Sequence, residues 1–382
     1  MTSLHSFCPQ TNETMWRQSW ERCQTMESEL SAEPRDMSQG ALRQLLEQQH
    51  HLLHHSSAAV QDLAALVIRA VLADAGLDAG QVDELILSNA LGGGGNPARL
   101  AALAAGLPDR VAGLSIDRQC AGGLDAIRLA AAMVGAGQAD VVIAGGAESY
   151  SRRPLRLAQT PGQAPVPYDQ PPFTPWPERD PEMTTAAAAL AQRLGISRAR
   201  QEAWAIRSHA RALAHPQPEV LGFAQGAADG FTRRLTPALA ARAKPLAGSI
   251  TVATAAVAAD AAAFVVVVSP RMAERAARRL RIAASATLGA LPEEPGLSPI
   301  PAMQAVLAQA GLDAQALERL ELMEAYAVQA LACMDALALP EDRVNPAGGA
   351  LARGHPIGAS GAILAARLFH GLQAGPGLAA IA

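Results

Sequence analysis

Lysine and aromatic residues are scarce in this chain of 382 residues, and positive charge is not in excess. Lys244 is the only lysine, and aromatic residues make up 3% of the sequence. With so few large rings, the core is expected to consist of close-packed, alanine-rich helices. The formal net charge of −4 argues against a nucleic-acid partner, which a basic surface would bind. Because no run of about 18 apolar residues occurs, we expect no membrane span and no membrane partner.

Cysteine is also rare, and its few positions are far apart. Cys8, Cys23, Cys120 and Cys333 include no C-x-x-C pair, so the spacing suggests neither a disulfide framework nor a zinc site. The first residues lack a basic segment followed by an apolar run, which a secretory leader would have. Reduced thiols and the missing leader together favour a cytoplasmic location.

The first 58 residues differ in composition from everything that follows. They are rich in Gln, Glu, Ser, Arg and His, and the alanine excess has not begun. We interpret residues 1–58 as an atypical N-terminal extension, either helical or disordered. Four histidines within it have the i, i+4 spacing that two metal ligands use, but no carboxylate or cysteine is placed to complete such a site, so a solvated helix face is preferred. They are His50, His51, His54 and His55.

From Ala59 to about residue 150, short apolar runs alternate with helical patterns. This alternation, with short turns between the elements, predicts a layered α/β domain. Helices are expected over 62–75, 99–105 and from Cys120 to about Gly135, and strands over 82–87, 111–116 and 140–144.

Residues 151–247 change character and are interpreted as a domain inserted into the α/β pattern. The segment 151–181 is dense in proline, and helices are expected over 182–194 and 197–213. Arg152 and Arg153 could hold a phosphorylated ligand, or they could be ordinary surface charges. A buried strand over 264–268 then marks the return to the α/β domain.

Cys120 lies between an apolar run that ends at Ile116 and a small-residue segment that reads as a helix. A thiol at such a strand-to-helix junction is expected to have a lowered pKa and to be a nucleophile, because free N–H groups at a helix N-terminus favour an anion. The alternative is that Cys120 is simply a small buried residue of the core.

The second half of the chain repeats part of the first. Residues 70–79 (AVLADAGLDA) reappear as residues 305–314 (AVLAQAGLDA). His355 is as far from the second copy as Cys120 is from the first, and each precedes an alanine-rich stretch. If the halves pack about a pseudo-twofold axis, this cysteine and this histidine will face one cleft.

These motifs resemble those of the thiolase family. The resemblance covers about residues 60–382, and the Gly354-His355-Pro356 block is its most specific part. It implies a duplicated five-layer α-β-α-β-α fold with an inserted loop domain. The halves would be 59–150 with 248–269 and then 270–382, on either side of a loop domain over 151–247. The segments that resemble the family are the one around Cys120 and residues 142–149, 195–209, 248–268, 324–327 and 348–361.

The resemblance also implies a function, which is acyl transfer from acyl-CoA without a metal or other cofactor. Cys120 would accept the acyl group and His355 would activate it, in the cleavage of a 3-ketoacyl-CoA or in the reverse condensation. Homodimers or homotetramers would be expected, with CoA and acyl-CoA as ligands. Gly354 would lie at the oxyanion hole, and the CoA-binding positions would include Arg152, Arg153, Ala256 and Gly358.

Four departures from the family pattern bear on this expectation. Met323 replaces an asparagine that orients a water in the oxyanion hole, and a thioether cannot donate a hydrogen bond. The CoA-contacting loop over 254–261 has lost its asparagines, serine and glycines. No thiol occurs at the position of the family's second cysteine, where Ala382 falls. The first strand and the glycine-rich strand after the second cysteine are also not found, so an incomplete sheet, a misassigned start and a truncated reading frame all stay open, and impaired activity is expected.

Two other functions therefore stay open. The chain could be a non-catalytic thiolase-like subunit that binds acyl-CoA or a partner protein. It could instead hydrolyse acyl thioesters with the same Cys120–His355 pair and water as the acceptor.

Overall fold

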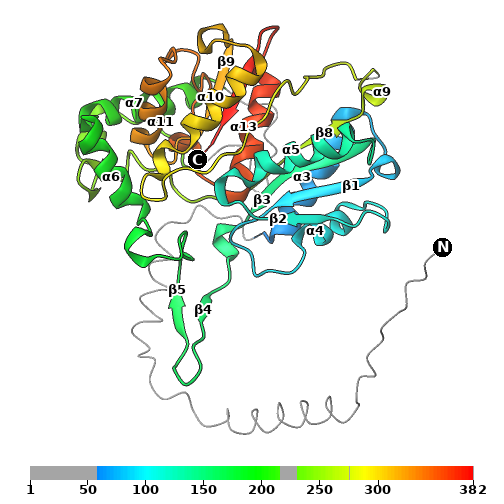
Figure 1. Ribbon diagram of the computed structural model, residues 1–382, viewed down its shortest axis with the longest axis horizontal. Helices are drawn as coiled ribbons and strands as arrows, with labels where there is room; N and C mark the ends of the chain where they lie inside the picture. The colour runs from blue at the N-terminus through cyan, green and yellow to red at the C-terminus, as the bar shows by residue number, and fades with distance from the viewer. Residues whose placement is uncertain (1–57, 216–229, 275, 382) are drawn as a thin grey trace, which may run out of the picture. The chain divides into compact units, whose positions relative to one another are not determined.

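The computed structural model describes residues 58–215, 230–274 and 276–381 (Figure 1). All of them belong to one compact unit, which runs from Leu53 to Ala382. The predicted N-terminal extension, with its four histidines, Cys8 and Cys23, lies outside the described residues, apart from Ala58. In the described part of the chain, no helix is both long and apolar enough to cross a membrane.

A mixed sheet in the order β2-β1-β3-β8 forms the first half of the fold. Strand β1 (Glu84–Ser88) pairs in parallel with both β2 (Leu114–Ile116) and β3 (Val141–Glu148). Strand β8 (Ala261–Val268) pairs with β3 in the antiparallel direction, so the chain returns to this sheet after the loop region.

Helices cover both faces of this sheet because its central strands are apolar on both sides. Alternate residues of β1 and β3 pack against α3 (Val60–Ala75) and α4 (Pro97–Ala105) on one face. The residues between them pack against α5 (Gly122–Gly135) on the other face. A strand that is buried on both faces reads as a continuous apolar run, which is how the sequence predicted these strands.

The second half contains a smaller parallel sheet, formed by β9 (Arg319–Leu322) and β10 (Gly377–Ala380). Helix α13 (Ile357–Gly371) contacts α5, the first sheet and both strands of the second sheet, so it lies with α5 between the two sheets (Figure 1). Helices α10 (Pro299–Ala310) and α11 (Ala327–Ala336) pack against β9 in a separate core. The order of layers is therefore helix, sheet, helix, sheet, helix.

Between the two halves, the loop region contains two longer helices, α6 (Met183–Leu194) and α7 (Arg198–Ala214). The Ser197 side chain caps α7 by accepting a hydrogen bond from the Arg200 N–H. A hairpin of β4 and β5 extends away from these helices (Figure 1). The shorter elements are β4 (Arg156–Ala158), β5 (Val166–Tyr168), α8 (Pro237–Ala241), β6 (Pro245–Ala247), β7 (Ile250–Thr251), α9 (Pro270–Ala273) and α12 (Ala350–Arg353).

Three predicted elements differ from the structure. Strand β3 continues to Glu148 instead of ending near residue 144, because Gly145 and Gly146 lie inside the strand. A β-carbon at Gly146 would lie 2.0 Å from the carbonyl oxygen of Gly358, so this glycine allows α13 to approach the sheet. Strand β2 is shorter than predicted, since the N–H of Val111 bonds to Pro108 within a turn. A short 3₁₀ turn also precedes α5, over Gln119–Ala121.

Candidate active site

Cys120 lies in the 3₁₀ turn that joins β2 to α5. The preceding residue, Gln119, has a positive φ of 47°, an unfavourable conformation for a residue with a side chain. Its N–H donates to Asp117 Oδ1 at 2.7 Å, which helps to hold this bend. Backbone strain of this kind often occurs where a reactive side chain must be presented in one direction.

His355 approaches Cys120 from the second half of the chain. The preceding residue, Gly354, has a φ of 95°, a conformation that favours glycine. The His355 N–H donates to the Val257 carbonyl at 2.7 Å, so the loop before β8 fixes the backbone of the histidine. The imidazole Nε2 lies 3.0 Å from Cys120 Sγ, and Nδ1 lies 2.7 Å from the Ser360 hydroxyl. The predicted pairing of Cys120 with His355 is therefore present in the structure.

The predicted lowering of the Cys120 pKa is wrong. Burial raises the pKa of this thiol to about 12, and the charges of Glu148 and Asp117 act in the same direction against a smaller lowering by the residue's own N–H. Burial also lowers the pKa of His355 to about 4. Helix α5 begins only at Gly122, so Cys120 precedes it and desolvation outweighs the helix terminus. At neutral pH the pair therefore rests as a thiol and a neutral imidazole.

Glu148, at the end of β3, joins the two halves beside this pair. Its carboxylate accepts hydrogen bonds from the side chain of Asn89 at 2.7 Å and from the N–H groups of Ala90 and Leu91 at 3.1 Å each. It also accepts from the Gly358 N–H, in the first turn of α13, at 2.9 Å. Burial is the main cause of its raised pKa. Because each oxygen already accepts two hydrogen bonds, Glu148 is placed to hold loops in position rather than to accept a substrate proton.

Glu324 makes a comparable set of contacts behind the histidine loop. Its carboxylate accepts from Trp204 Nε1 at 3.0 Å and from the Ser208 hydroxyl at 2.8 Å, both on α7. It also accepts from Asn345 Nδ2 at 2.8 Å and from the Leu351 N–H at 3.2 Å. This buried carboxylate, whose pKa burial raises, therefore ties the loop region to the segment that leads to His355.

Sequence reasoning assigned no role to Glu148, Glu324 or Ser360. All three lie inside the segments that carried the family resemblance, so their positions were visible. What the sequence did not show is that the hydrogen bonds of both glutamates join parts of the chain that are far apart.

The segment 254–259, which has lost its polar side chains, contributes through its backbone. Ala256 donates its N–H to the Ala325 carbonyl at 2.9 Å, and the Thr254 carbonyl accepts from Ala327 at 2.8 Å. Ala258 forms a parallel bridge with His355. These contacts hold the segment after Glu324 and the backbone of His355, and they need no particular side chain, which explains how alanine fits at Ala256.

The other predicted ligand positions have mixed surroundings. The Arg153 guanidinium lies 3.8 Å from the centre of the Tyr150 ring and pairs with Asp169 at 3.2 Å, so protein groups already engage it. Arg152 ends the 3₁₀ turn Tyr150–Arg152. Gly358 is buried, and the role of all three in binding CoA stays a prediction.

Met323 and Cys333, the other sulfur-containing residues singled out in the sequence, are both buried. Met323 follows β9 and is 2% exposed, and its N–H donates to the Ala380 carbonyl at 2.9 Å. Cys333 lies inside α11, and its Sγ lies 3.7 Å from Gln329 Nε2. Among the described residues, no three His, Cys, Asp or Glu side chains are grouped so that they could hold a metal ion.

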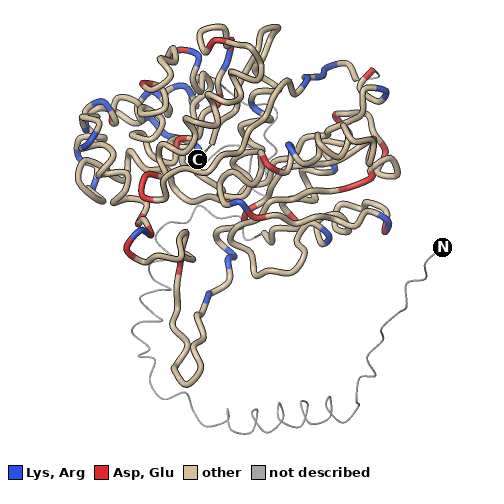
Figure 2. Tube along the Cα trace, viewed as in Figure 1, with Lys and Arg blue, Asp and Glu red and all other residues tan. Residues whose placement is uncertain are grey.

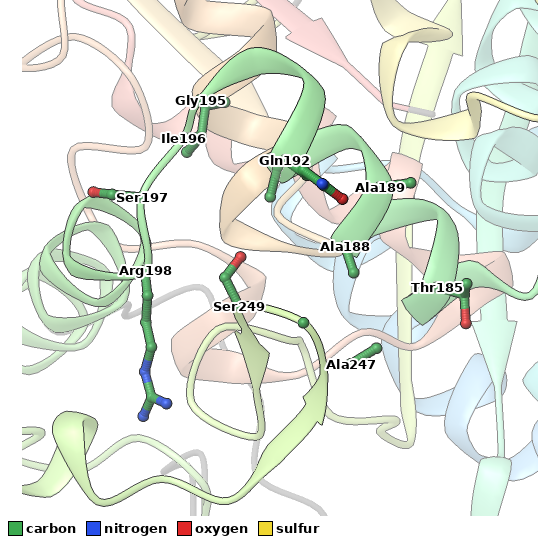
Figure 3. A pocket seen from close by; sticks show the side chains of 12 residues that line it. Thr185, Ala188, Ala189, Gln192, Gly195, Ile196, Ser197, Arg198, Ala247 and Ser249 are labelled. Atoms are coloured by element: carbon green, nitrogen blue, oxygen red, sulfur yellow. The ribbon is translucent and has the colours of Figure 1, made fainter.

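A separate open pocket of about 660 Å³ lies in the loop region. Figure 3 shows its walls, which come from α6, the start of α7 and the turn at 247–249. Its polar lining includes Thr185, Gln192 and Ser249, but neither Cys120 nor His355. We therefore assign the chemistry to the Cys120–His355 pair and not to this pocket.

Charged residues of both signs are interspersed along the described chain (Figure 2).

Comparison with known proteins agrees with the fold. Residues 44–222 match the thiolase N-terminal domain, and residues 277–382 match the thiolase C-terminal domain. The Bacillus subtilis protein YhfS, a candidate acetyl-CoA C-acetyltransferase by name, is 38% identical over 326 residues, covering 81% of this chain and 85% of its own. VraB of Staphylococcus epidermidis, similarly named, is 36% identical over 311 residues, covering 76% and 80%.

A solved structure gives the same result. The crystal structure of the Bacillus anthracis acetyl-CoA acetyltransferase matches with a TM-score of 0.74 and 30% identity, covering 82% of this chain and 86% of that one. The chain belongs to the thiolase family, a family of acyltransferases. This confirms the resemblance and the thiolase-like α/β fold predicted from the sequence.

Proposed function

We propose that this protein transfers an acyl group from an acyl-CoA thioester onto Cys120 and then to an acceptor. The reaction would be the thiolysis of a 3-ketoacyl-CoA or the condensation of two acyl-CoA molecules. The observation that carries the proposal is the 3.0 Å contact between Cys120 Sγ and His355 Nε2. A nucleophile and a base within hydrogen-bond distance, the base held by a third group, is the arrangement that covalent catalysis requires.

In the first step of the condensation, His355 Nε2 takes the proton of the Cys120 thiol while the sulfur attacks the thioester carbonyl. The bond between that carbonyl and the CoA sulfur then breaks, and the proton on His355 passes to the departing thiolate. The products are an acyl-thioester on Cys120 and free CoA. Proton transfer during attack suits this pair, because both groups are neutral before substrate binds.

The second step distinguishes the proposal from its alternatives. Met323 supplies no hydrogen-bond donor in place of the family's asparagine, so stabilisation of negative charge on the substrate is expected to be weaker than in the family. We therefore expect acylation of Cys120 to proceed well and carbon–carbon chemistry to be slow. A hydrolase would release the acyl group to water, and a non-catalytic subunit would form no acyl-enzyme.

Intact mass spectrometry after incubation with acetyl-CoA tests the proposal. The expected result is a single acetyl adduct that maps to Cys120 and is absent from Cys120→Ala. The His355→Ala variant should acylate about 10²- to 10⁴-fold more slowly, because it lacks the base. His370→Ala is a matched control, since His370 is exposed near the other end of α13 and should leave the rate unchanged. If the wild-type protein forms no adduct on Cys120, the proposal fails.

The fate of the adduct then identifies the acceptor. Added CoA should discharge acyl-Cys120 as acyl-CoA, whereas a hydrolase would discharge it equally fast without CoA. We further propose a homodimer or homotetramer in the cytoplasm. The oligomer follows from the family's usual state, and the location follows from the unpaired spacing of the cysteines.

A further inference from the structure

A chain of hydrogen bonds continues from Cys120 past His355 to the start of α13. The Ser360 hydroxyl lies 2.7 Å from His355 Nδ1, on the side of the ring opposite to the thiol. The same hydroxyl lies 3.2 Å from the carbonyl oxygen of Pro356, to which it donates. Ser360 is 3% exposed, so water contributes little to satisfying these groups. The three side chains therefore form a Cys–His–Ser series that ends on a backbone carbonyl.

We propose that Ser360 is a positioning residue that holds His355 in the tautomer with hydrogen on Nδ1 and a free lone pair on Nε2. The inference rests on the proposed function only in making Cys120 the nucleophile. A serine hydroxyl has one hydrogen. When the Pro356 carbonyl accepts it, the contact with Nδ1 can form only if the imidazole supplies the hydrogen. Nε2 then faces the Cys120 thiol as an acceptor.

The opposite tautomer would disable the pair. With hydrogen on Nε2, the ring would donate to Cys120 Sγ, and no base would face the thiol proton. The Ser360 hydrogen would have to turn to Nδ1, and the hydroxyl would lose its bond to Pro356. Ser360 thus favours the one neutral form of His355 that can act as a base, a role that a buried carboxylate has in other catalytic triads.

A hydroxyl in this position has a consequence that a carboxylate would not have. Ser360 carries no charge, so it does not stabilise the imidazolium that forms when His355 takes the proton. Both residues also lie at the start of α13, a helix of 15 residues whose N-terminus disfavours positive charge. Once protonated, His355 should therefore return its proton readily to the departing CoA sulfur.

Nitrogen-15 NMR of histidine-labelled protein tests the tautomer directly. The His355 ring signals are assigned as those that disappear in His355→Gln. In the wild type we expect Nδ1 to carry the hydrogen, and in Ser360→Ala we expect a mixture of tautomers or a shift to Nε2. The inference is overturned if the wild type carries its hydrogen on Nε2, or if Ser360→Ala leaves the tautomer unchanged.

Alkylation of Cys120 by iodoacetamide at pH 7 gives a second readout that needs no acyl-CoA. Ser360→Ala should react about tenfold more slowly, and Ser360→Thr, which keeps the hydroxyl, should restore most of the rate. Ser298→Ala is the matched control, because Ser298 also donates to a proline carbonyl, at 2.8 Å, but lies before α10. Equal rates in Ser360→Ala and the wild type would overturn the inference. Failure of acyl transfer alone would leave both measurements intact, so the two proposals fail separately.

Discussion

Burial, rather than helix geometry, sets the charge state of Cys120 and His355. A strand-to-helix junction was visible in the sequence, but the degree of desolvation around a side chain depends on parts of the chain that are distant in sequence. His355 and Glu148 are such parts, and both come to Cys120 only in the folded chain. The sequence therefore predicted the identity of the pair and the wrong direction for the thiol pKa.

The resting state of this pair leads to a prediction on pH dependence. Since the His355 pKa is lowered to about 4, the base stays neutral well below pH 6, and acylation should be lost only as the pH falls through about 4. The acylation rate at pH 5 should therefore be close to that at pH 7. At pH 7 the ultraviolet absorbance of the wild type should also differ little from that of Cys120→Ser, because Cys120 contributes little thiolate absorbance. An acylation rate that falls near pH 6.5 would contradict the prediction.

Met323 gives a residue-scale prediction on the second step. Met323→Asn restores an amide beside Glu324, and it should speed the condensation of acetyl-Cys120 with a second acetyl-CoA, the carbon–carbon step, by about 10²-fold. The same change should lower the free energy of unfolding by about 1–3 kcal/mol, because it buries a polar group in an apolar site. Urea unfolding and rapid-quench mass spectrometry measure the two effects.

A second buried methionine provides the control. Met303 on α10 is 1% exposed, so Met303→Asn should lose comparable stability without faster condensation. If the rate of condensation is unchanged in Met323→Asn, then Met323 does not occupy the oxyanion-hole position that the resemblance assigns to it.

At the scale of elements, close contact between α5 and α13 brings the reactive residues together. A β-carbon at Gly361 would lie 2.5 Å from the Leu124 nitrogen, and one at Gly123 would lie 2.5 Å from the Ala362 nitrogen. The turn with Cys120 leads into α5, and only Pro356 separates His355 from α13. The distance between the two helices therefore controls the distance between thiol and imidazole.

Gly361→Ala tests this control. The added methyl group should force the helices apart, lower the free energy of unfolding by about 1–3 kcal/mol and slow acylation of Cys120. Gly135→Ala, at the other end of α5, is the control because nothing lies within 4 Å of the added atom. It should be neutral or stabilise by roughly 0.5–1 kcal/mol. If Gly361→Ala acylates Cys120 at the wild-type rate, then the contact between the two helices does not control the distance between thiol and imidazole.

The same helix contact explains which elements the sequence could predict. Helices α3, α4, α6 and α7 were predicted within a few residues, because apolar periodicity and capping residues are local signals. Strand β3 was predicted too short, since Gly145 and Gly146 read as a terminus although they lie where α13 and β8 approach. A local pattern does not distinguish a glycine that ends a strand from one that admits a neighbour.

For the molecule as a whole, the duplication was the most informative feature of the sequence. It predicted that His355 would face Cys120 although the two are far apart in the chain, and the structure places them in contact. The contacts of Glu324 were not predictable in this way, because they join the second half to α7 of the inserted region, which the repeat does not include.

Buried neutral histidines also affect the stability of the whole molecule. His209 on α7 is 1% exposed, its Nδ1 accepts from the Arg233 N–H at 3.3 Å, and its ring centre lies 5.7 Å from that of Phe231. Burial, with a smaller effect from the Arg233 charge, lowers the pKa of His209 to about 4. Below about pH 6.5 the unfolded chain takes up a proton here that the folded chain does not. The folded state is therefore fully favoured above pH 6.5 and loses stability as the pH falls toward 4.

Urea unfolding between pH 7.5 and pH 4 tests this prediction. The His209 contribution should reach about 3 kcal/mol of lost stability near pH 4, and His355 should act in the same direction. His209→Gln removes the titrating group, so its stability should be lower at pH 7 but should fall less steeply with acid. His370→Gln, at an exposed position, should keep the wild-type slope. A slope in His209→Gln equal to that of the wild type would show that this buried histidine does not couple folding to pH.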